Sequence, residues 1–335
     1  MSISAPRNDA GRRSPIVVQT RGSVRETEHP FVVAVAHAGS DVDLAGVDRV
    51  TPFRSAAKPF QLANSLGFLG DPDLTDEELA IGAASHSAEP RHVELARKVL
   101  SRFGVPETGL RCGGHAPMHA PSAEALVRSG EHFTDIHNNC SGKHAFMLAA
   151  AVRQGWEVDY RPSTHPLQVG NSVLISALSG WDPQLATDGC GVPTFCLPVT
   201  AIARAWSVLA AASPVSTMGR DPQVIARLSR VANAMAVHPE LTSGEGRLDL
   251  LLAETIREPY IGKIGAQGVF CIALPKRGLG IAVKVTSGLS ETLAAAVPWA
   301  LQTFAPGAFD APLDWPPTDV RNVVGALVGR YQVEG

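Results

Sequence analysis

Strand-like segments lie at the two ends of this chain, and helical patterns fill the region between them. Residues 15–19 and 31–37 are rich in β-branched side chains, and residues 269–274 and 279–286 are apolar runs separated by a Pro-Lys-Arg-Gly turn. If these distant strands share one sheet, the helices between them form an insertion. We therefore predict an α+β fold, with an antiparallel sheet built from N- and C-terminal strands, flanked by helices, and a mostly helical middle region.

The middle of the chain repeats apolar side chains with helical spacing. The predicted helices span residues 55–66, 76–84, 91–103, 123–128, 143–154, 168–178, 199–212 and 223–237. A later helix is expected at 291–304, and a short helix is expected at the C-terminus. Because no linker divides the middle, we expect one domain over residues 15–335, with a helical lobe at about 55–240, preceded by a flexible segment 1–14.

The composition excludes several classes of protein. Of the 335 residues, 45% are apolar, and the formal net charge is -3, so the chain is neither disordered nor basic enough to bind nucleic acid. Five cysteines, an odd number, argue against a disulfide framework and favour a reducing compartment. No stretch approaches the roughly 18 apolar residues of a membrane helix. We expect a cytoplasmic protein without a membrane span.

Lysine is the scarce cation, since six lysines leave 23 arginines among the 29 basic residues. An arginine always keeps its charge, whereas a lysine can lose its proton. A genomic bias toward arginine explains the scarcity but not the positions that remain lysine. We therefore interpret each lysine as a candidate for a place that needs a neutral amine. The lysines are Lys58, Lys98, Lys143, Lys263, Lys276 and Lys284.

The first candidate site is Ser55-Ala56-Ala57-Lys58. Residues three apart share a helical face, and a neutral lysine can take the proton of a serine hydroxyl, as in Ser-x-x-Lys enzymes. Pro59 is tolerated only in a first helical turn, so Lys58 lies at a helix start, where the backbone dipoles disfavour a protonated amine. A capping serine beside a solvated lysine is the commoner origin of this spacing.

A second candidate is Ser85-His86-Ser87, at the end of a predicted helix. An ordinary helix terminus explains these polar side chains equally well. The functional interpretation is that a second serine passes protons to a leaving group.

The third candidate joins two polar segments, 137–144 and 188–193. Gly142-Lys143 is not a phosphate loop, because the required glycine five residues earlier and the following Ser or Thr are missing. Cys140 and Cys190 stand on separate tight loops and could share a soft metal such as zinc. A buried, inert thiol is the commoner fate of a single cysteine.

A fourth candidate surrounds two late lysines. Lys263 lies in a glycine-rich segment that precedes a strand, which suggests close approach of backbone to a ligand, and Lys284 lies near a strand end. Periodicity alone does not choose between them.

Together, segments 54–61, 137–144, 188–193 and 263–269 resemble the asparaginase II family, typified by the inducible rhizobial L-asparaginase, whose fold is similar to serine β-lactamases and penicillin-binding proteins. The resemblance extends from the first strands to the last helix. It implies a β-lactamase-like catalytic domain that hydrolyses L-asparagine to L-aspartate and ammonia.

The resemblance implies two Ser-Lys tandems, Ser55 with Lys58 and Ser85 with Lys263. Ser55, deprotonated by Lys58, would attack the side-chain amide and form an acyl-enzyme, while Ser85 and Lys263 would relay a proton to the departing ammonia. An exchange of the two serines stays open, as does the choice between Lys263 and Lys284.

The resemblance also implies binding groups and a metal. Arg54, His144 and Asp188 would surround the substrate, with Asp188 facing its α-ammonium. Cys140, Lys143 and Cys190 would hold a Zn²⁺ ion that organises the substrate pocket rather than activating the attacking water. Lys143 would have to be neutral to donate its lone pair, so arginine could not replace it. A homodimer is implied as well.

Other functions remain open from the sequence. The scaffold would also suit a glutaminase or a β-lactam or peptide hydrolase, because fold alone does not name a substrate. A metal-centred hydrolase and a non-catalytic zinc- or ligand-binding module are further alternatives.

Overall fold

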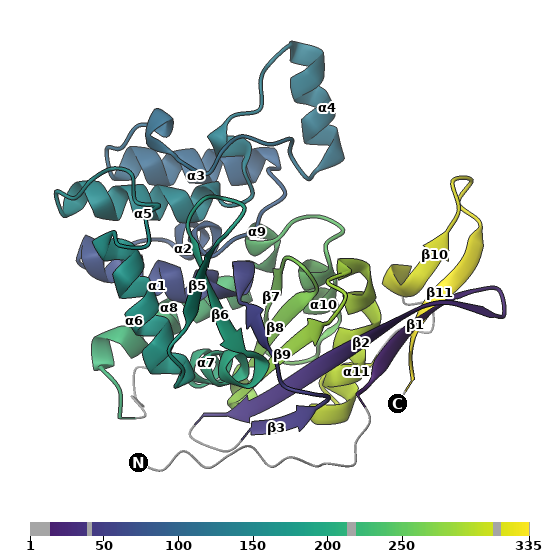
Figure 1. Cartoon of the computed structure of the whole chain (residues 1–335). Coiled ribbons are helices and arrows are strands. Elements are labelled where there is room, and N and C mark those ends of the chain that lie inside the picture. Colours follow the sequence, from purple (N-terminus) through teal and green to yellow (C-terminus); the bar gives the residue numbers. More distant parts are fainter. Residues whose placement is uncertain (1–13, 39–41, 213–218, 311–315, 335) are drawn as a thin grey trace. The chain divides into compact units, whose positions relative to one another are not determined.

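The computed structural model of the chain describes residues 14–38, 42–212, 219–310 and 316–334 (Figure 1). Of the segment 1–14, which we predict to be flexible, only Ser14 lies within the described residues. Internal contacts divide the chain into two compact units. The first unit comprises Met1–Ala56, Leu197–Ala211 and Leu251–Gly335, and the second comprises Ala57–Cys196 and Ala212–Leu250. The single-domain assignment stays a prediction.

The first unit is built on an antiparallel sheet with strand order β10-β11-β1-β2-β9-β8-β7, and β3 pairs with the far end of β2. The strands of this sheet are β1 (Ile16–Arg21), β2 (Val24–His37), β3 (Val42–Ala45), β7 (Ile261–Gly265), β8 (Val269–Leu274), β9 (Leu279–Val285), β10 (Asp319–Arg321) and β11 (Leu327–Glu334). The short strand β4 (Val50–Pro52) also lies in the first unit but is not part of this sheet. Helices α7 (Val199–Ala211) and α11 (Leu293–Phe304) pack on this sheet. The predicted α+β fold with a sheet from both chain ends is confirmed.

The C-terminus corrects one expectation. The short terminal helix that we expected is wrong, because this segment forms the β10–β11 hairpin, and β11 pairs with β1. Asn322 supplies the turn, since its side chain accepts the backbone N–H groups of Val324 and Ala326. Tyr331 and Val333, which are partly buried, then alternate with the exposed Arg330, Gln332 and Glu334, which is the period of a strand rather than of a helix.

The second unit is mostly helical, as predicted. It contains α1 (Lys58–Leu69), α2 (Asp76–Gly82), α3 (Pro90–Arg102), α4 (Ala120–Ser129), α5 (Ser141–Arg153), α6 (Pro166–Ser179), α8 (Pro222–Val237) and α9 (Pro239–Thr242), together with the strand pair β5 (Gln184–Thr187) and β6 (Pro193–Pro198). Strand β6 and helix α10 (Leu248–Thr255) each span a boundary between the units. Helix α5 is buried from Ser141 to Ala151 and packs against α1, α2 and α3. The starts of α1 and α5 therefore lie in the interior of this unit.

Within the described ranges, no helix is both long and apolar enough to cross a lipid bilayer. The cytoplasmic location stays a prediction.

Candidate active site

Lys58 is the first residue of α1 and is almost completely buried, with 1% of its surface exposed. Pro59 follows it in the first turn, as the sequence predicts. The Lys58 Nζ lies 2.9 Å from Ser85 Oγ, 2.5 Å from the Ala84 carbonyl oxygen and 3.2 Å from the Asn139 carbonyl oxygen. Burial lowers the pKa of Lys58, and the charge of Lys143 adds to this effect. Burial therefore makes the proton of Lys58 easier to remove than that of an exposed lysine.

The Lys58 Nζ can donate to all three oxygen neighbours as an ammonium, which has three N–H groups. A neutral amine has two N–H donors and one lone pair, and carbonyl oxygens can only accept hydrogen bonds. In the neutral form the carbonyls of Ala84 and Asn139 would therefore take the two N–H groups, and the lone pair would accept a hydrogen bond from the Ser85 hydroxyl. This is the hydrogen-bonding arrangement of a general base and its hydroxyl.

Ser85 is held in place by its backbone. After α2 ends, the Ser85 N–H donates to the Thr242 carbonyl at 3.0 Å, and the Ser87 N–H donates to the Ser243 carbonyl at 3.0 Å. His86 is structural: its Nδ1 accepts the Ala88 N–H at 3.1 Å, so its Nε2–H donates to Ser141 Oγ at 2.9 Å. Ser85 therefore lies beside Lys58 on a fixed backbone.

A second buried group joins the start of α5 to the turn between β5 and β6. Cys140 is the N-cap residue of α5, Lys143 lies in its first turn, and the Lys143 Nζ is 3.4 Å from Cys190 Sγ. All three side chains are 3–6% exposed. Two sulfur donors and one amine therefore lie together in the second unit, although they come from segments 47 residues apart.

The thiols and the amine influence one another's protonation. A hydrogen bond from the Cys190 thiol, with the charges of Lys58 and Lys143, holds the pKa of Cys140 well below its ordinary value. That hydrogen bond and burial raise the pKa of Cys190. Burial opposes the charged form of Lys143, but the sulfurs of Cys190 and Cys140 outweigh it and raise the pKa of Lys143.

The donor chemistry of this group fits zinc, which binds thiolate sulfur and neutral nitrogen. Among the described residues, no cluster of three or more His, Cys, Asp or Glu side chains is arranged to hold a metal ion. A zinc ion at Cys140 and Cys190 would therefore need Lys143 as its third protein ligand.

Gly142 allows α5 to approach α2 closely. A Cβ at residue 142 would lie 2.1 Å from the Ile81 carbonyl oxygen, so any side chain there would push the two helices apart. Lys143 follows directly, and the Ala84-Ser85 segment follows α2. The glycine thus sets the distance between α5, which carries Lys143, and the segment after α2, which carries Ser85, the neighbour of Lys58.

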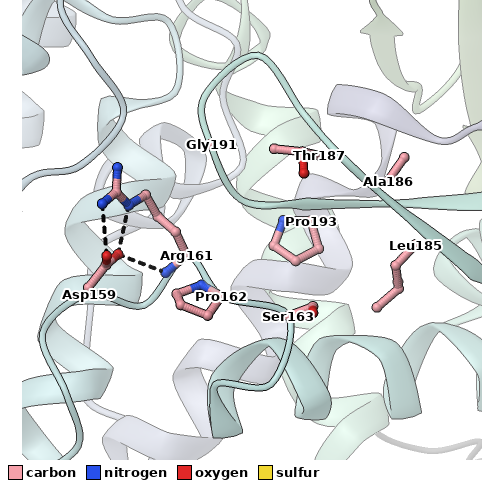
Figure 2. A pocket seen from close by; sticks show the side chains of 9 residues that line it. All are labelled: Asp159, Arg161, Pro162, Ser163, Leu185, Ala186, Thr187, Gly191 and Pro193. Carbon is pink, nitrogen blue, oxygen red and sulfur yellow. Dashed lines mark hydrogen bonds and ion pairs between the residues drawn. The ribbon is translucent and has the colours of Figure 1, made fainter.

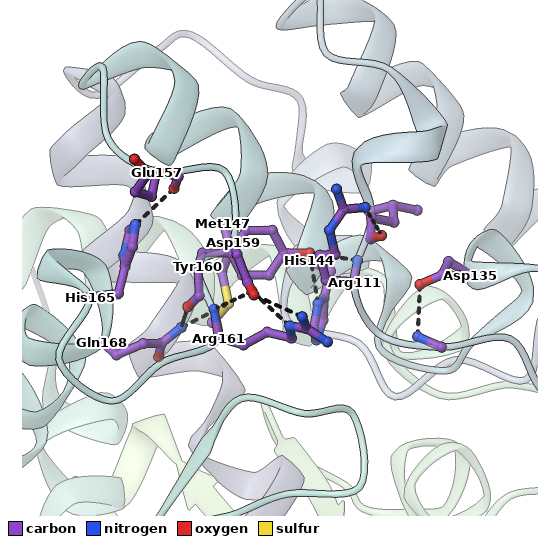
Figure 3. A network of polar contacts seen from close by, with 12 residues as sticks. Arg111, Asp135, His144, Met147, Glu157, Asp159, Tyr160, Arg161, His165 and Gln168 are labelled. Atoms are coloured by element: carbon purple, nitrogen blue, oxygen red, sulfur yellow. Dashed lines mark hydrogen bonds and ion pairs between the residues drawn. The ribbon is translucent and has the colours of Figure 1, made fainter.

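His144 is fully buried, and its Nδ1 lies 3.0 Å from the hydroxyl of Tyr160, which also accepts the backbone N–H of Arg111 at 3.0 Å (Figure 3). The His144 Nε2 has no hydrogen-bond partner within the described part of the chain. Tyr160 was not anticipated from the sequence. The one signal was its rarity, since the chain holds three tyrosines.

Asp188 opens the turn that carries Cys190. Its Oδ1 accepts the Gly189 N–H at 2.7 Å, and its backbone N–H donates to the Val192 carbonyl at 2.9 Å. A pocket of about 420 Å³ lies beside this turn and is lined by Asp159, Arg161, Pro162, Ser163, Leu185, Ala186, Thr187, Gly191 and Pro193 (Figure 2). Its Arg161 is tied to Asp159 by two hydrogen bonds of 2.7 and 2.8 Å. The charges of the pocket wall are thus already paired.

The first unit holds the remaining predicted residues. Arg54 adopts a left-handed conformation with φ of 54°, directly before Ser55 in a short 3-10 helix (Arg54–Ala57). A positive φ in a residue other than glycine is strained, and such strain is common beside functional side chains. Lys263 is fully buried on β7, and Lys284 lies on β9.

The register of the sheet relates these two lysines. Lys263 pairs with Cys271 on β8, and Cys271 pairs with Ala282 on β9, two residues before Lys284. Paired residues, and residues two apart along a strand, share a face of the sheet. Lys263 and Lys284 therefore belong to the same face. The Lys284 amine donates to the carbonyl of Gln267, and burial together with Arg49 and Arg54 lowers its pKa to about 8.

The structure thus brings together Lys58 with Ser85, and Lys143 with Cys140 and Cys190. Each predicted Ser-Lys tandem takes one residue from each unit, since Ser55 and Lys263 belong to the first unit. Both tandems stay predictions.

Comparison with known proteins identifies the family of this chain. The family model described as L-asparaginase II matches residues 17–333. No curated protein sequence matches the chain.

Several solved structures are similar at low sequence identity. The native form of Mglu at 4.3 M NaCl is 16% identical, with a TM-score of 0.46, and the match covers 82% of this chain and 60% of Mglu. A putative beta-lactamase from Bacteroides dorei is 14% identical over 77% of this chain and 86% of its own, with a TM-score of 0.39. The Bacillus subtilis glutaminase YbgJ, in covalent complex with 5-oxo-L-norleucine, is 13% identical over 78% and 83%, with a TM-score of 0.36. The chain thus spans 60% of the length of Mglu.

Proposed function

Because the chain belongs to the L-asparaginase II family, we propose that it hydrolyses the side-chain amide of L-asparagine to L-aspartate and ammonia. Family membership supports amidohydrolase activity. The observation that supports the chemistry is the buried amine of Lys58, 2.9 Å from the hydroxyl of Ser85, the serine proposed to relay the proton. A neutral lysine and a serine are the two groups that an acyl-transfer mechanism without histidine needs.

The proposed reaction has two stages. Ser55 attacks the amide carbon, and Lys58 takes the serine proton. Lys58 then returns that proton through Ser85, its hydrogen-bonded neighbour, to the amide nitrogen, so that ammonia leaves and an aspartyl ester remains on Ser55. Water hydrolyses the ester, which releases L-aspartate and restores the serine. Lys263 keeps its predicted role as a partner in the proton relay.

The remaining predicted residues bind rather than react. Arg54, His144 and Asp188 are proposed to hold the charged groups of the amino acid. Cys140, Lys143 and Cys190 would hold a zinc ion, which would supply a fixed positive charge that organises the substrate pocket. The site residues themselves perform the proton transfers. The proposed assembly is a homodimer.

The roles of the two serines are separated by two variants. We expect Ser55→Ala to abolish ammonia release and to leave no covalent aspartyl adduct in quenched samples analysed by mass spectrometry. We expect Ser85→Ala to slow the reaction about 100-fold while the adduct site remains Ser55, because one proton transfer is impaired. Ser129→Ala, at an exposed position, is the control. Near-normal turnover in Ser55→Ala would mean that Ser85 is the nucleophile.

Substrate specificity is tested by assaying L-glutamine and a chromogenic β-lactam beside L-asparagine. The proposal requires the highest kcat/KM for asparagine. A higher kcat/KM for glutamine or for the β-lactam would contradict the proposed asparaginase activity and indicate a glutaminase or a β-lactam hydrolase instead. Zinc bound tightly by a protein that hydrolyses no amide would instead support a binding module.

A further inference from the structure

The hydroxyl of Tyr160 links two segments that sequence analysis did not connect. Tyr160 is fully buried just before α6, its ring contacts the ring of His144 edge-on with centroids 5.4 Å apart, and its hydroxyl meets both Arg111 and His144 (Figure 3). Both contacts lie within the second unit. The direction of these two hydrogen bonds determines which ring nitrogen of His144 carries a hydrogen.

The hydrogen positions follow from counting donors. A backbone N–H can only donate, so the Tyr160 oxygen accepts the hydrogen of Arg111. The hydroxyl still has one hydrogen of its own, and His144 Nδ1 is the remaining contact within the described part of the chain. If Nδ1 carried a hydrogen as well, the phenol hydrogen would be buried without an acceptor, which costs about 1–3 kcal/mol. The hydroxyl therefore donates to Nδ1.

This donation decides the other ring nitrogen. In a neutral imidazole one nitrogen is an acceptor and the other carries the hydrogen, so His144 carries it on Nε2. That nitrogen is buried and has no partner in the described residues. An N–H donor without an acceptor in a protein interior is costly unless a ligand completes it. A nitrogen that carries a hydrogen also has no lone pair for a metal.

Tyr160 is itself fixed by a chain of side-chain amides. The Gln168 side chain donates to the Tyr160 carbonyl at 2.7 Å and accepts from Asn171 at 3.0 Å, and Asn171 accepts from Asn64 at 2.9 Å. This chain ties the Tyr160 backbone to α6 and α1. The ring position therefore does not depend on the histidine that it contacts.

We propose that Tyr160 is a positioning residue that holds His144 as the Nε2–H tautomer, so that His144 donates a hydrogen bond to an oxygen of the substrate and is not a metal ligand. The tautomer stands on its own, whereas the substrate contact rests on the proposed amidohydrolase function. If the role of Tyr160 were purely structural, its hydroxyl would accept the hydrogen bond from the Arg111 N–H but would have no effect on the tautomer of His144.

The tautomer is tested by NMR on protein labelled with ¹⁵N-histidine, with the His144 signals assigned by their loss in His144→Gln. We expect a protonated Nε2 and an unprotonated Nδ1 in the wild type. In Tyr160→Phe, both nitrogens should move toward averaged values, while Tyr331→Phe should leave them unchanged. An unprotonated Nε2 in the wild type overturns the proposal, whether or not the protein hydrolyses asparagine.

The substrate contact is tested by kinetics in two backgrounds. Tyr160→Phe should raise KM for asparagine about tenfold with a smaller change in kcat, the effect of one hydrogen bond. In His144→Gln, whose amide nitrogen can replace the Nε2–H donor, the same tyrosine change should raise KM no further. An equal rise in both backgrounds, or a lower melting temperature with unchanged KM and unchanged His144 signals, would show a purely structural role.

Discussion

The first turns of α1 and α5 both carry a buried lysine, but their surroundings have opposite effects. Lys58 meets two carbonyl oxygens and a hydroxyl, and burial lowers its pKa. Lys143 meets the sulfurs of Cys190 and Cys140, which raise its pKa despite burial. Both side chains are at most 3% exposed, so burial alone does not set the charge of an amine. The neighbouring groups make Lys58 suitable as a base, whereas they favour the charged form of Lys143 beside the sulfurs, so zinc binding at Lys143 would have to release its proton.

The largest expected effect comes from Lys58→Arg, because a guanidinium cannot act as a base. Ammonia release from asparagine should fall about 1,000-fold, within the range of general acid–base catalysis. Lys98→Arg, at an exposed helical position, should retain full activity. Lys58→Met, which can pack without the charge, checks that the loss is chemical, and its fold is verified by circular dichroism. Normal turnover in Lys58→Arg would show that Lys58 is not the general base.

A smaller effect is expected for Lys143→Arg, since Lys143 would bind the metal and not the reacting proton. Zinc content measured on purified protein should drop, and KM for asparagine should rise by about 10- to 100-fold. Lys276→Arg, in the turn between β8 and β9, serves as the matched control. Unchanged zinc content and unchanged KM would exclude Lys143 from a metal site.

Gly142→Ala tests whether the separation of α2 and α5 supports both lysine groups. The added methyl would meet the Ile81 carbonyl, so the free energy of unfolding in urea should fall by about 1–3 kcal/mol. Gly189→Ala is the control, because a Cβ at that glycine meets nothing within 4 Å. Equal stability of the two variants would contradict the close approach.

The smallest effect concerns Lys284 and depends on pH. Its pKa in the folded protein is about 8, below the ordinary value of 10.5, because burial and two arginines disfavour the charge. Between these values the unfolded chain binds more protons, so stability from this residue rises with pH, while below about pH 8 the cost of the charge is constant. Lys284→Met should therefore be more stable than the wild type at pH 7 in urea titrations, with the difference shrinking by pH 10. A difference that grows with pH would contradict the lowered pKa.

Local pattern predicted much of the secondary structure. The strands β8 and β9 and the helix starting at Lys58 follow from apolar runs, a turn and Pro59, which depend on neighbours in sequence. The C-terminal hairpin was missed because Gly, Tyr and Val in a short polar segment give a weak period. The pairing of Ser55 with Lys58 follows from their three-residue spacing. The tandem of Ser85 with Lys263 could not be derived from spacing, because these two residues lie far apart along the chain.

By itself, the sequence singled out the residues that we propose to carry the chemistry. The scarcity of lysine singled out the amines, and the segments that hold them resemble the family whose model matches residues 17–333. Only the tertiary structure decided their neighbours. It places Lys58 beside Ser85, Lys143 beside Cys190, and His144 beside Tyr160, which belongs to none of the sequence motifs. The physical reason is that a side chain's protonation and tautomer depend on groups within a few ångströms, and the folded chain draws those groups from distant segments.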